Sequence, residues 1–264
     1  MGLEWVRVDN YEAMSEAGAA RIAAVIEDRL GKHRPAVVGM ATGNTMLRLY
    51  ERLAETLNQR RLDLAGLHTF NLDEYVAADG RSVPADHPLS YHAYMEKNFF
   101  ARLDPDLAMR RDQIHFPDPT CPTAVDERIE RLGGLDVQLL GIGFNGHIAF
   151  NEPVSEAEIS VAEFAALPTR VIDLTERTIE TNARLTAGGN RAQVPRRAVT
   201  LGMKPILAAR EILLLACFPE QREPLRRIRQ GRVTPELPAS YLIDHPHATI
   251  LYTADTICLG EGLH

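Results

Sequence analysis

The residues best suited to chemistry lie in the stretch GIGFNGHIAFNEP, residues 141–153, which contains a G-x-G-x-x-G pattern at Gly141, Gly143 and Gly146. A dinucleotide-binding turn needs its third glycine to lead into a helix, with an acidic residue about twenty positions further on. Pro153 disfavours helical geometry at Glu152, so no helix of useful length is expected to follow the glycines. The pattern therefore predicts a glycine-rich turn that serves another purpose.

This turn presents Asn145, His147 and Glu152. A histidine with a carboxylate nearby forms a plausible acid–base dyad, because the imidazole titrates near neutrality. The alternative is a buried histidine whose ring is satisfied by a backbone carbonyl. One histidine and one glutamate do not complete a coordination shell, so no metal site is predicted.

A second candidate is Asp73-Glu74, which follows the apolar run Leu67–Leu72. A carboxylate at the carboxyl end of a strand is well placed to act as a general base. The alternative is a solvated pair that caps the next segment.

A third candidate is Thr42-Gly43-Asn44-Thr45, between an apolar strand and an amphipathic helix. Backbone N–H groups and hydroxyls at a helix N-terminus make a natural phosphate cradle. The alternative is an ordinary helix cap, with Asn44 or Thr42 as the capping residue and Gly43 in a tight turn. No Walker lysine follows, so this is not a nucleotide P-loop.

Cations for a phosphate are available in the segment from Arg177 to Arg184, and at Lys204 and Arg222. One or two of these side chains are expected to clamp a phosphate group. Most of the other arginines, including Arg226 and Arg227, are expected on solvated helix faces.

The elements that must position these residues alternate between short apolar runs and longer amphipathic segments. This alternation predicts a three-layer α/β/α fold with an open, mostly parallel sheet of Rossmann-like topology. We expect one domain over residues 1–264, with the least regular part, residues 153–195, acting as a mobile lid. Strands are predicted over 6–8, 36–40, 67–72, 113–116, 137–142, 170–174, 198–201, 211–218 and 249–253, and helices over 13–30, 45–58, 91–103, 124–132, 204–209, 223–229 and 238–243.

Composition narrows the classes of partner. The chain has 264 residues, of which 45% are hydrophobic and 25% charged, as in ordinary globular proteins. Its net charge of -7 argues against nucleic-acid binding, which needs a basic face. The longest apolar run, Ile212–Phe218, is too short to span a membrane. Three cysteines without a framework, and no signal peptide, indicate the cytoplasm.

Several motifs together resemble the glucosamine-6-phosphate deaminase (isomerase) family, in order from about Val37 to Leu215. They are "TFNLDEY", "HPLSYHAYMEKNFF", "GIGFNGHIAFNEP", "LTERTIETNAR" and "VPRRAVTLGM". The resemblance implies that a 2-amino-2-deoxyhexose 6-phosphate becomes a ketohexose 6-phosphate plus ammonia, without a metal or redox cofactor. It also implies homo-oligomers, either trimers or hexamers.

The resemblance also assigns roles to residues. Asp73 matches the base that moves a proton between C2 and C1, and His147 matches the group that opens the pyranose ring. Glu152 and Asn145 match the partners of that histidine. The phosphate-binding residues match the loop formed by Thr42, Gly43, Asn44 and Thr45, together with Arg184.

The chain departs from the family pattern at the phosphate. The family loop reads T-G-G-T-P or similar, whereas here Asn44 and Met46 stand in it. The family also has a Gly and then a phosphate-binding Lys after the strand that ends near Cys217. Here Phe218-Pro219-Glu220-Gln221-Arg222 follows, so Arg222 or Lys204 is the expected substitute. Alternatives are a galactosamine-6-phosphate deaminase, a 6-phosphogluconolactonase-like hydrolase and a catalytically silent sugar-phosphate sensor.

Overall fold

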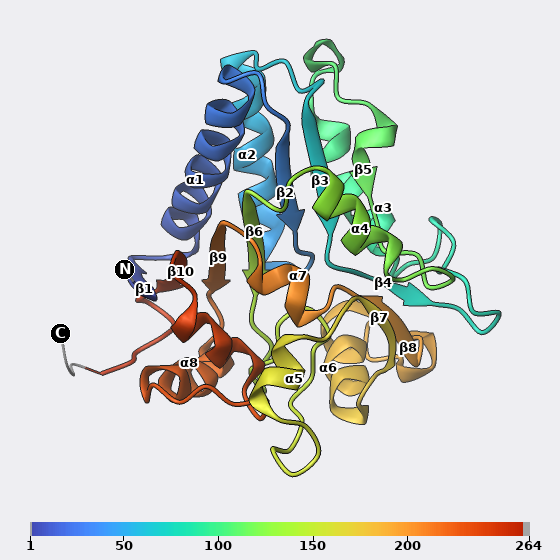
Figure 1. Cartoon of the computed structure of the whole chain (residues 1–264), viewed down its shortest axis with the longest axis vertical. Helices are drawn as coiled ribbons and strands as arrows, with labels where there is room; N and C mark the ends of the chain where they lie inside the picture. Colours follow the sequence, from blue (N-terminus) through green and yellow to red (C-terminus); the bar gives the residue numbers. More distant parts are fainter. Residues whose placement is uncertain (1, 261–264) are drawn as a thin grey trace.

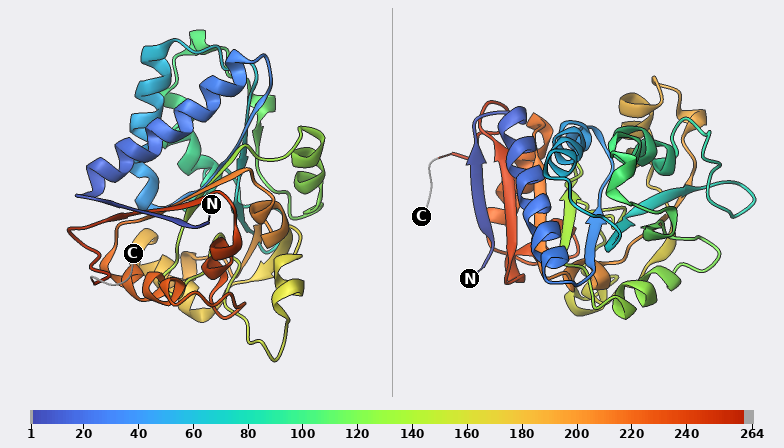
Figure 2. Two further views of the ribbon diagram at one scale, coloured as in Figure 1. Left: turned by 60° about the vertical axis from the view of Figure 1, so that its left-hand side comes forward. Right: turned by 90° about the horizontal axis from the view of Figure 1, so that it is seen from above.

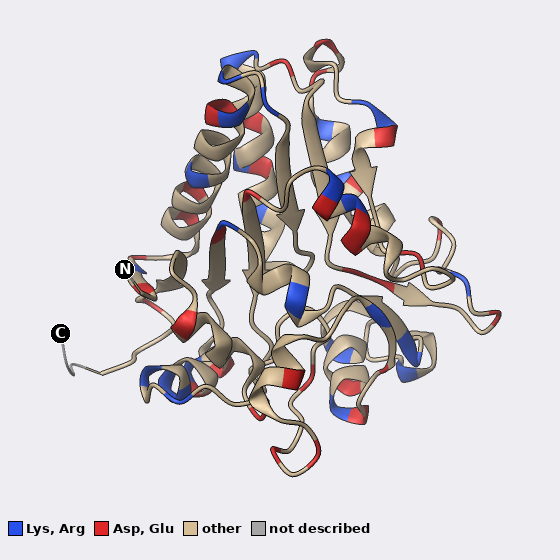
Figure 3. Ribbon diagram, viewed as in Figure 1, with Lys and Arg blue, Asp and Glu red and all other residues tan. Residues whose placement is uncertain are grey.

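The computed structural model describes residues 2–260 and centres on a sheet of seven strands in the order β1-β10-β9-β6-β2-β3-β5 (Figure 1). All neighbouring pairs in this sheet are parallel. The central strands β2 and β6 carry no charged residue (Figure 3), as expected for strands covered on both faces. The strands are β1 (Glu4–Val8), β2 (Ala36–Met40), β3 (Leu67–Asn71), β5 (Ile114–His115), β6 (Val137–Gly141), β9 (Glu211–Ala216) and β10 (Ala248–Thr253).

Helices lie on both faces of this sheet and complete the predicted three-layer fold. One face carries α1 (Tyr11–Gly31) and α2 (Leu47–Arg60), and the other carries α4 (Ala124–Arg131) and α7 (Met203–Leu207) (Figure 2). Helix α1 packs on β2, β9 and β10. The other helices are α3 (Tyr91–Asn98), α5 (Val161–Ala165), α6 (Glu176–Thr186) and α8 (Arg222–Arg229). None of the helices within residues 2–260 is long and apolar enough to cross a membrane.

A second, antiparallel sheet was not anticipated from the sequence. It has the order β4-β8-β7, formed by β4 (Asp73–Val76), β8 (Arg197–Thr200) and β7 (Arg170–Asp173). The sequence predicted β7 and β8 as strands, but β4 is too short and too polar to show a pattern. The segment predicted to be least regular, 153–195, in fact contains α5, β7 and α6. The small sheet and α6 lie beyond the carboxyl ends of the central parallel strands (Figure 1).

One close contact in the main sheet gives a test of the packing. Gly39 on β2 pairs with Gln138 on β6, and both lie within the sheet. A Cβ atom at position 39 would stand 2.1 Å from Oε1 of Gln138. The Gln138 side chain is fully buried, and its Nε2 atom donates to the Leu139 carbonyl at 2.8 Å, so it has no room to move.

We therefore expect Gly39→Ala to lower the free energy of unfolding by about 1–3 kcal/mol, the usual cost of overpacking a core. Urea denaturation measures this change. Gly31→Ala is the matched control, because nothing lies within 4 Å of a Cβ atom there. Equal stabilities of the two variants would contradict the packing described for Gly39.

Candidate active site

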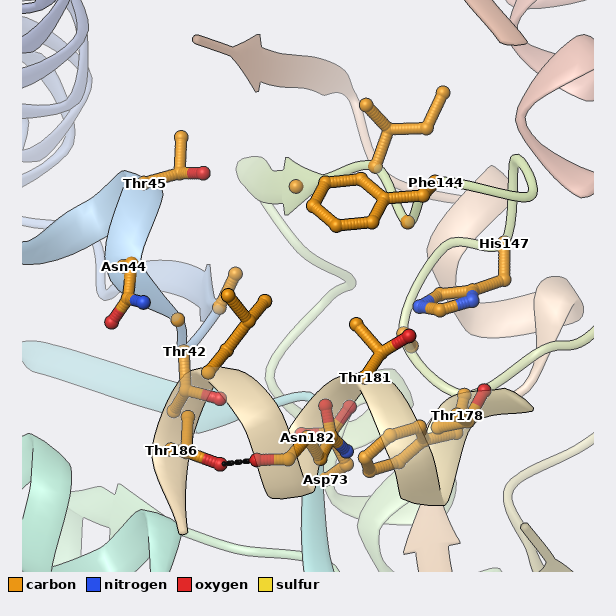
Figure 4. A pocket seen from close by; sticks show the side chains of 18 of the residues that line it. Thr42, Asn44, Thr45, Asp73, Phe144, His147, Thr178, Thr181, Asn182 and Thr186 are labelled. Carbon is orange, nitrogen blue, oxygen red and sulfur yellow. Dashed lines mark hydrogen bonds between the residues drawn. The ribbon is translucent and has the colours of Figure 1, made fainter. Parts of the chain in front are cut away.

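A cavity of about 250 Å³ opens where the neighbouring strands β9, β6, β2 and β3 end. After β2 the chain adds β3 and β5 towards one edge of the sheet, and it then returns to place β6 on the other side of β2. Such a switch point is the usual ligand site of an open α/β sheet. Residues of α6 line the cavity as well, among them Thr178 and Asn182 (Figure 4).

The loop after β2 forms one side of the cavity. Thr42, Asn44 and Thr45 lie on that side, and His147 lies on the opposite side (Figure 4). Gly43 has φ of 120°, a conformation that strongly favours glycine, so the chain can turn sharply here. No side chain caps the short 3-10 turn Asn44–Met46 or the start of α2. The alternative that Thr42 or Asn44 is simply a helix cap is therefore not supported.

The adjacent carboxylates of β4 have separate tasks, because successive side chains of a strand point to opposite faces. Glu74 accepts hydrogen bonds from the amides of Tyr91 (3.0 Å) and His92 (2.9 Å), and so caps the N-terminus of α3. Asp73 lines the cavity and is 6% exposed. Burial, together with the charge of Glu74, raises the pKa of Asp73 well above its usual value. The site thus holds a carboxylate with increased basicity.

His147 and Glu152 form the second pair. The Nδ1 atom of His147 lies 3.6 Å from Oε1 of Glu152, and the other carboxylate oxygen accepts from Nδ2 of Asn145 at 2.7 Å. The Thr178 hydroxyl also donates to this carboxylate. Burial alone would raise the pKa of Glu152, but the contact with His147 and the hydrogen bonds from Thr178 and Asn145 lower it to about 2. An ionised carboxylate therefore stands beside the imidazole.

The imidazole of His147 packs against the backbone of the glycine-rich turn. No side chain fits at position 143, because a Cβ atom there would stand 2.3 Å from Cε1 of His147. As expected, Gly146 does not lead directly into a helix. The next helix is α5, which begins at Val161. Ala149, a lining residue, has φ of 51°, which is uncommon for a residue with a side chain. Backbone held in this region is often found at functional sites.

The structure does not bring the expected cations together at the cavity. Arg184 is exposed on α6, next to the lining residue Leu185. Lys204 is exposed and lies 3.6 Å from Glu130, and Arg222 is exposed at the start of α8. None of these three residues lines the cavity; within residues 2–260, Arg177 is the lining arginine.

Other lining residues were missed by sequence reasoning. Tyr91 and Tyr94 on α3 and Thr178 on α6 lie within the motifs HPLSYHAYMEKNFF and LTERTIETNAR, but no role was assigned to them individually. The recognisable signal for Thr178 was the helix itself, since Thr175 precedes it as an N-cap whose side chain accepts from the Thr178 amide. Gln221, after β9, also lines the cavity.

Comparison with known proteins places this geometry in a family. Residues 9–252 match the model of the glucosamine-6-phosphate isomerases/6-phosphogluconolactonase family. A glucosamine-6-phosphate deaminase of Rhodopirellula baltica is 40% identical over 242 residues, 89% of each chain. Glucosamine-6-phosphate deaminase 2 of Bacillus subtilis is 36% identical over 250 residues, 92% of each chain. The chain belongs to this family.

Solved structures agree. A monomeric glucosamine-6-phosphate deaminase superposes with a TM-score of 0.83 at 30% identity, over 96% of this chain and 98% of the other. The 6-phosphogluconolactonase of Leishmania guyanensis has a TM-score of 0.70 at 20% identity, over the full length of both chains. The second comparison supports the shared fold alone.

The packing of Gly143 leads to a prediction for catalysis. Gly143→Ala should push the His147 ring out of position and lower kcat about 100-fold, the lower end of what a positioned acid–base group contributes. Steady-state kinetics measure the loss, and thermal unfolding checks that the variant is folded. Gly31→Ala, where nothing lies within 4 Å of a Cβ atom and φ is not positive, controls for the loss of a glycine. Full activity of Gly143→Ala would contradict the role given to this contact.

The burial of Asp73 leads to a prediction for stability. Its pKa is higher in the folded state than in the unfolded state, so ionisation of Asp73 favours unfolding as the pH rises through the folded pKa. Asp73→Asn should therefore be more stable than the parent chain at pH 8, on the order of 1–3 kcal/mol. The difference should shrink towards pH 4, where the parent aspartate is protonated when folded. Denaturant titrations across this range measure it, and a difference independent of pH would contradict the shifted pKa.

Proposed function

We propose that the chain is a glucosamine-6-phosphate deaminase, which converts glucosamine 6-phosphate to fructose 6-phosphate and ammonia. One observation carries the proposal: the buried Asp73 and the His147 imidazole backed by Glu152 open into one cavity, beside a loop suited to phosphate. The curated relatives and the most similar of the cited structures bear the same name.

The first chemical task is to open the sugar ring. The substrate is a cyclic hemiacetal, so one proton must leave O1 and another must reach the ring oxygen. His147 is suited to carry this proton because its imidazole lines the cavity and has the Glu152 carboxylate beside it. Asn145 holds Glu152 beside the ring, and the ionised Glu152 stabilises the imidazolium that forms during the transfer.

The second task is to move a proton between carbons. Asp73 takes the proton from C2 of the open-chain aminosugar and returns a proton to C1. The enolamine that forms in between becomes a ketimine, and water then adds to its carbon and releases ammonia. The C–N bond is therefore broken by water, which is the hydrolytic part of the proposal. A buried carboxylate is suited to the carbon acid, because poor hydration makes it a stronger base.

The third task is to hold the phosphate. The proposed ligands are the loop formed by Thr42, Gly43, Asn44 and Thr45, together with Arg184, which directly precedes the lining residues Leu185 and Thr186 on α6. Binding energy from this remote group aligns C1 and C2 with the catalytic side chains. We also propose that residues 153–195, which include α6, act as a lid over the bound sugar.

The cellular setting is part of the proposal. We propose that the chain works in the cytoplasm, where its phosphosugar substrate would be found. The free thiols of Cys121, Cys217 and Cys258 are compatible with that reducing compartment. A trimer or hexamer stays a prediction from family resemblance, because the similar solved deaminase is described as a monomer. Light scattering of the purified chain measures its state.

The activity is tested by ammonia release. Glucosamine 6-phosphate should release ammonia, and galactosamine 6-phosphate tests the other epimer in the same assay. Acid release from 6-phosphogluconolactone tests the hydrolase alternative. Asp73→Asn should lower kcat at least about 1000-fold, within the range of a general base, and change KM by less than about threefold. Asp86→Asn is the control, since Asp86 is exposed. An Asp73→Asn variant that keeps a tenth of the activity would show that the base is elsewhere.

A further inference from the structure

Tyrosine hydroxyls from separate helices hold the carbonyl groups of the Thr42 loop. Tyr94 of α3 donates to the Gly43 carbonyl at 2.7 Å, and Tyr11 of α1 donates to the Asn44 carbonyl at 3.1 Å. Tyr50 of α2 donates to the Ala41 carbonyl. The loop is therefore tied at three of its carbonyls to the helices α1, α2 and α3.

These contacts also set the direction of the loop's amides. In a planar trans peptide the C=O and the N–H point in opposite directions. Holding the carbonyls of Ala41, Gly43 and Asn44 thus fixes the N–H groups of Thr42, Asn44 and Thr45. Within residues 2–260, no acceptor is recorded for any of these three N–H groups. Three donors with fixed directions are left beside the cavity.

The neighbouring wall of the cavity is occupied by Gln221, whose side chain is uncharged. Gln221 is buried, and its Oε1 atom accepts from the amides of Cys217 and Phe218, both at 2.8 Å. Its Nε2 atom donates to the Ile142 carbonyl at 2.8 Å. Gln221 thus supports the backbone of the wall, and the exposed Arg222 does not line the cavity. Oriented dipoles matter most for an anion where the neighbouring wall carries no cation.

We propose that Tyr11, Tyr50 and Tyr94 are positioning residues for phosphate binding, which orient the loop's peptide groups so that their N–H groups bind the anion. This inference rests on the proposed role of the Thr42 loop as the phosphate site. The hydroxyls donate to the loop's carbonyls and so act through the backbone, which places their effect on affinity more than on turnover.

The tyrosines are suited to this task over a wide range of pH. Burial raises the pKa of Tyr94 and of Tyr50 well above the usual value for a phenol, and burial is also the main reason that the pKa of Tyr11 is raised. Each hydroxyl therefore keeps its proton and remains a donor. Tyr11 also accepts from the Arg48 amide at 3.1 Å, so it joins the loop to the first turn of α2.

Tyr94→Phe is the most direct test, because it removes one hydroxyl and keeps the ring. Calorimetric titration with inorganic phosphate should give a Kd raised about tenfold, the upper range for one lost hydrogen bond. KM for glucosamine 6-phosphate should rise by a similar factor, with kcat changed less than about threefold. Tyr241→Phe is the matched control: its hydroxyl donates to the Val161 carbonyl at 3.0 Å and it does not line the cavity.

The outcomes separate the two proposals. Weaker phosphate binding in Tyr94→Phe but not in Tyr241→Phe supports the positioning role, even if no ammonia is released and the proposed function fails. A phosphate Kd within twofold of the parent value, an equal loss in both variants, or no phosphate binding by the parent chain would overturn it. Thermal unfolding of both variants shows that the comparison is made between folded proteins.

Discussion

The site depends on keeping one carboxylate poorly hydrated at the end of a parallel sheet. Asp73 is buried, and the nearby charge of Glu74 adds to the cost of its ionisation. A group in this state is stable only when the surrounding backbone is firmly held. Here it stands on a strand, not a free loop, because β4 pairs with β8 and Asp73 lies opposite Thr200. The small second sheet is thus the support of the proposed base.

The carboxylates at the site differ in the hydrogen bonds that they accept. Asp73 is left basic, whereas Glu152 is surrounded by donors and stays ionised. Glu74, adjacent to Asp73 in sequence, accepts hydrogen bonds from the amides at the N-terminus of α3. Environment therefore assigns a different task to each of three carboxylates, and residue type alone would not distinguish them.

Much of this arrangement could be predicted from sequence. Strands such as β2 and β6 are continuous apolar runs, and chemistry was expected directly after them. Prediction failed where the pattern was weak. Helix α6 is mostly polar and rich in threonine, which has low helix propensity, so its capping by Thr175 is easily overlooked. Lys204 and Arg222 were proposed from their charge and as substitutes for the family's phosphate-binding lysine. The direction in which an exposed cation points depends on tertiary packing that no local pattern records.

Helix α6 spans the cavity from end to end. Near its first turn, Thr178 donates to the carboxylate of Glu152, and its last residue, Thr186, lines the same cavity as Thr42 (Figure 4). A helix of eleven residues is about 16 Å long. Any tilt of α6 would therefore alter the surroundings of the proposed ring-opening pair and of the proposed phosphate loop together.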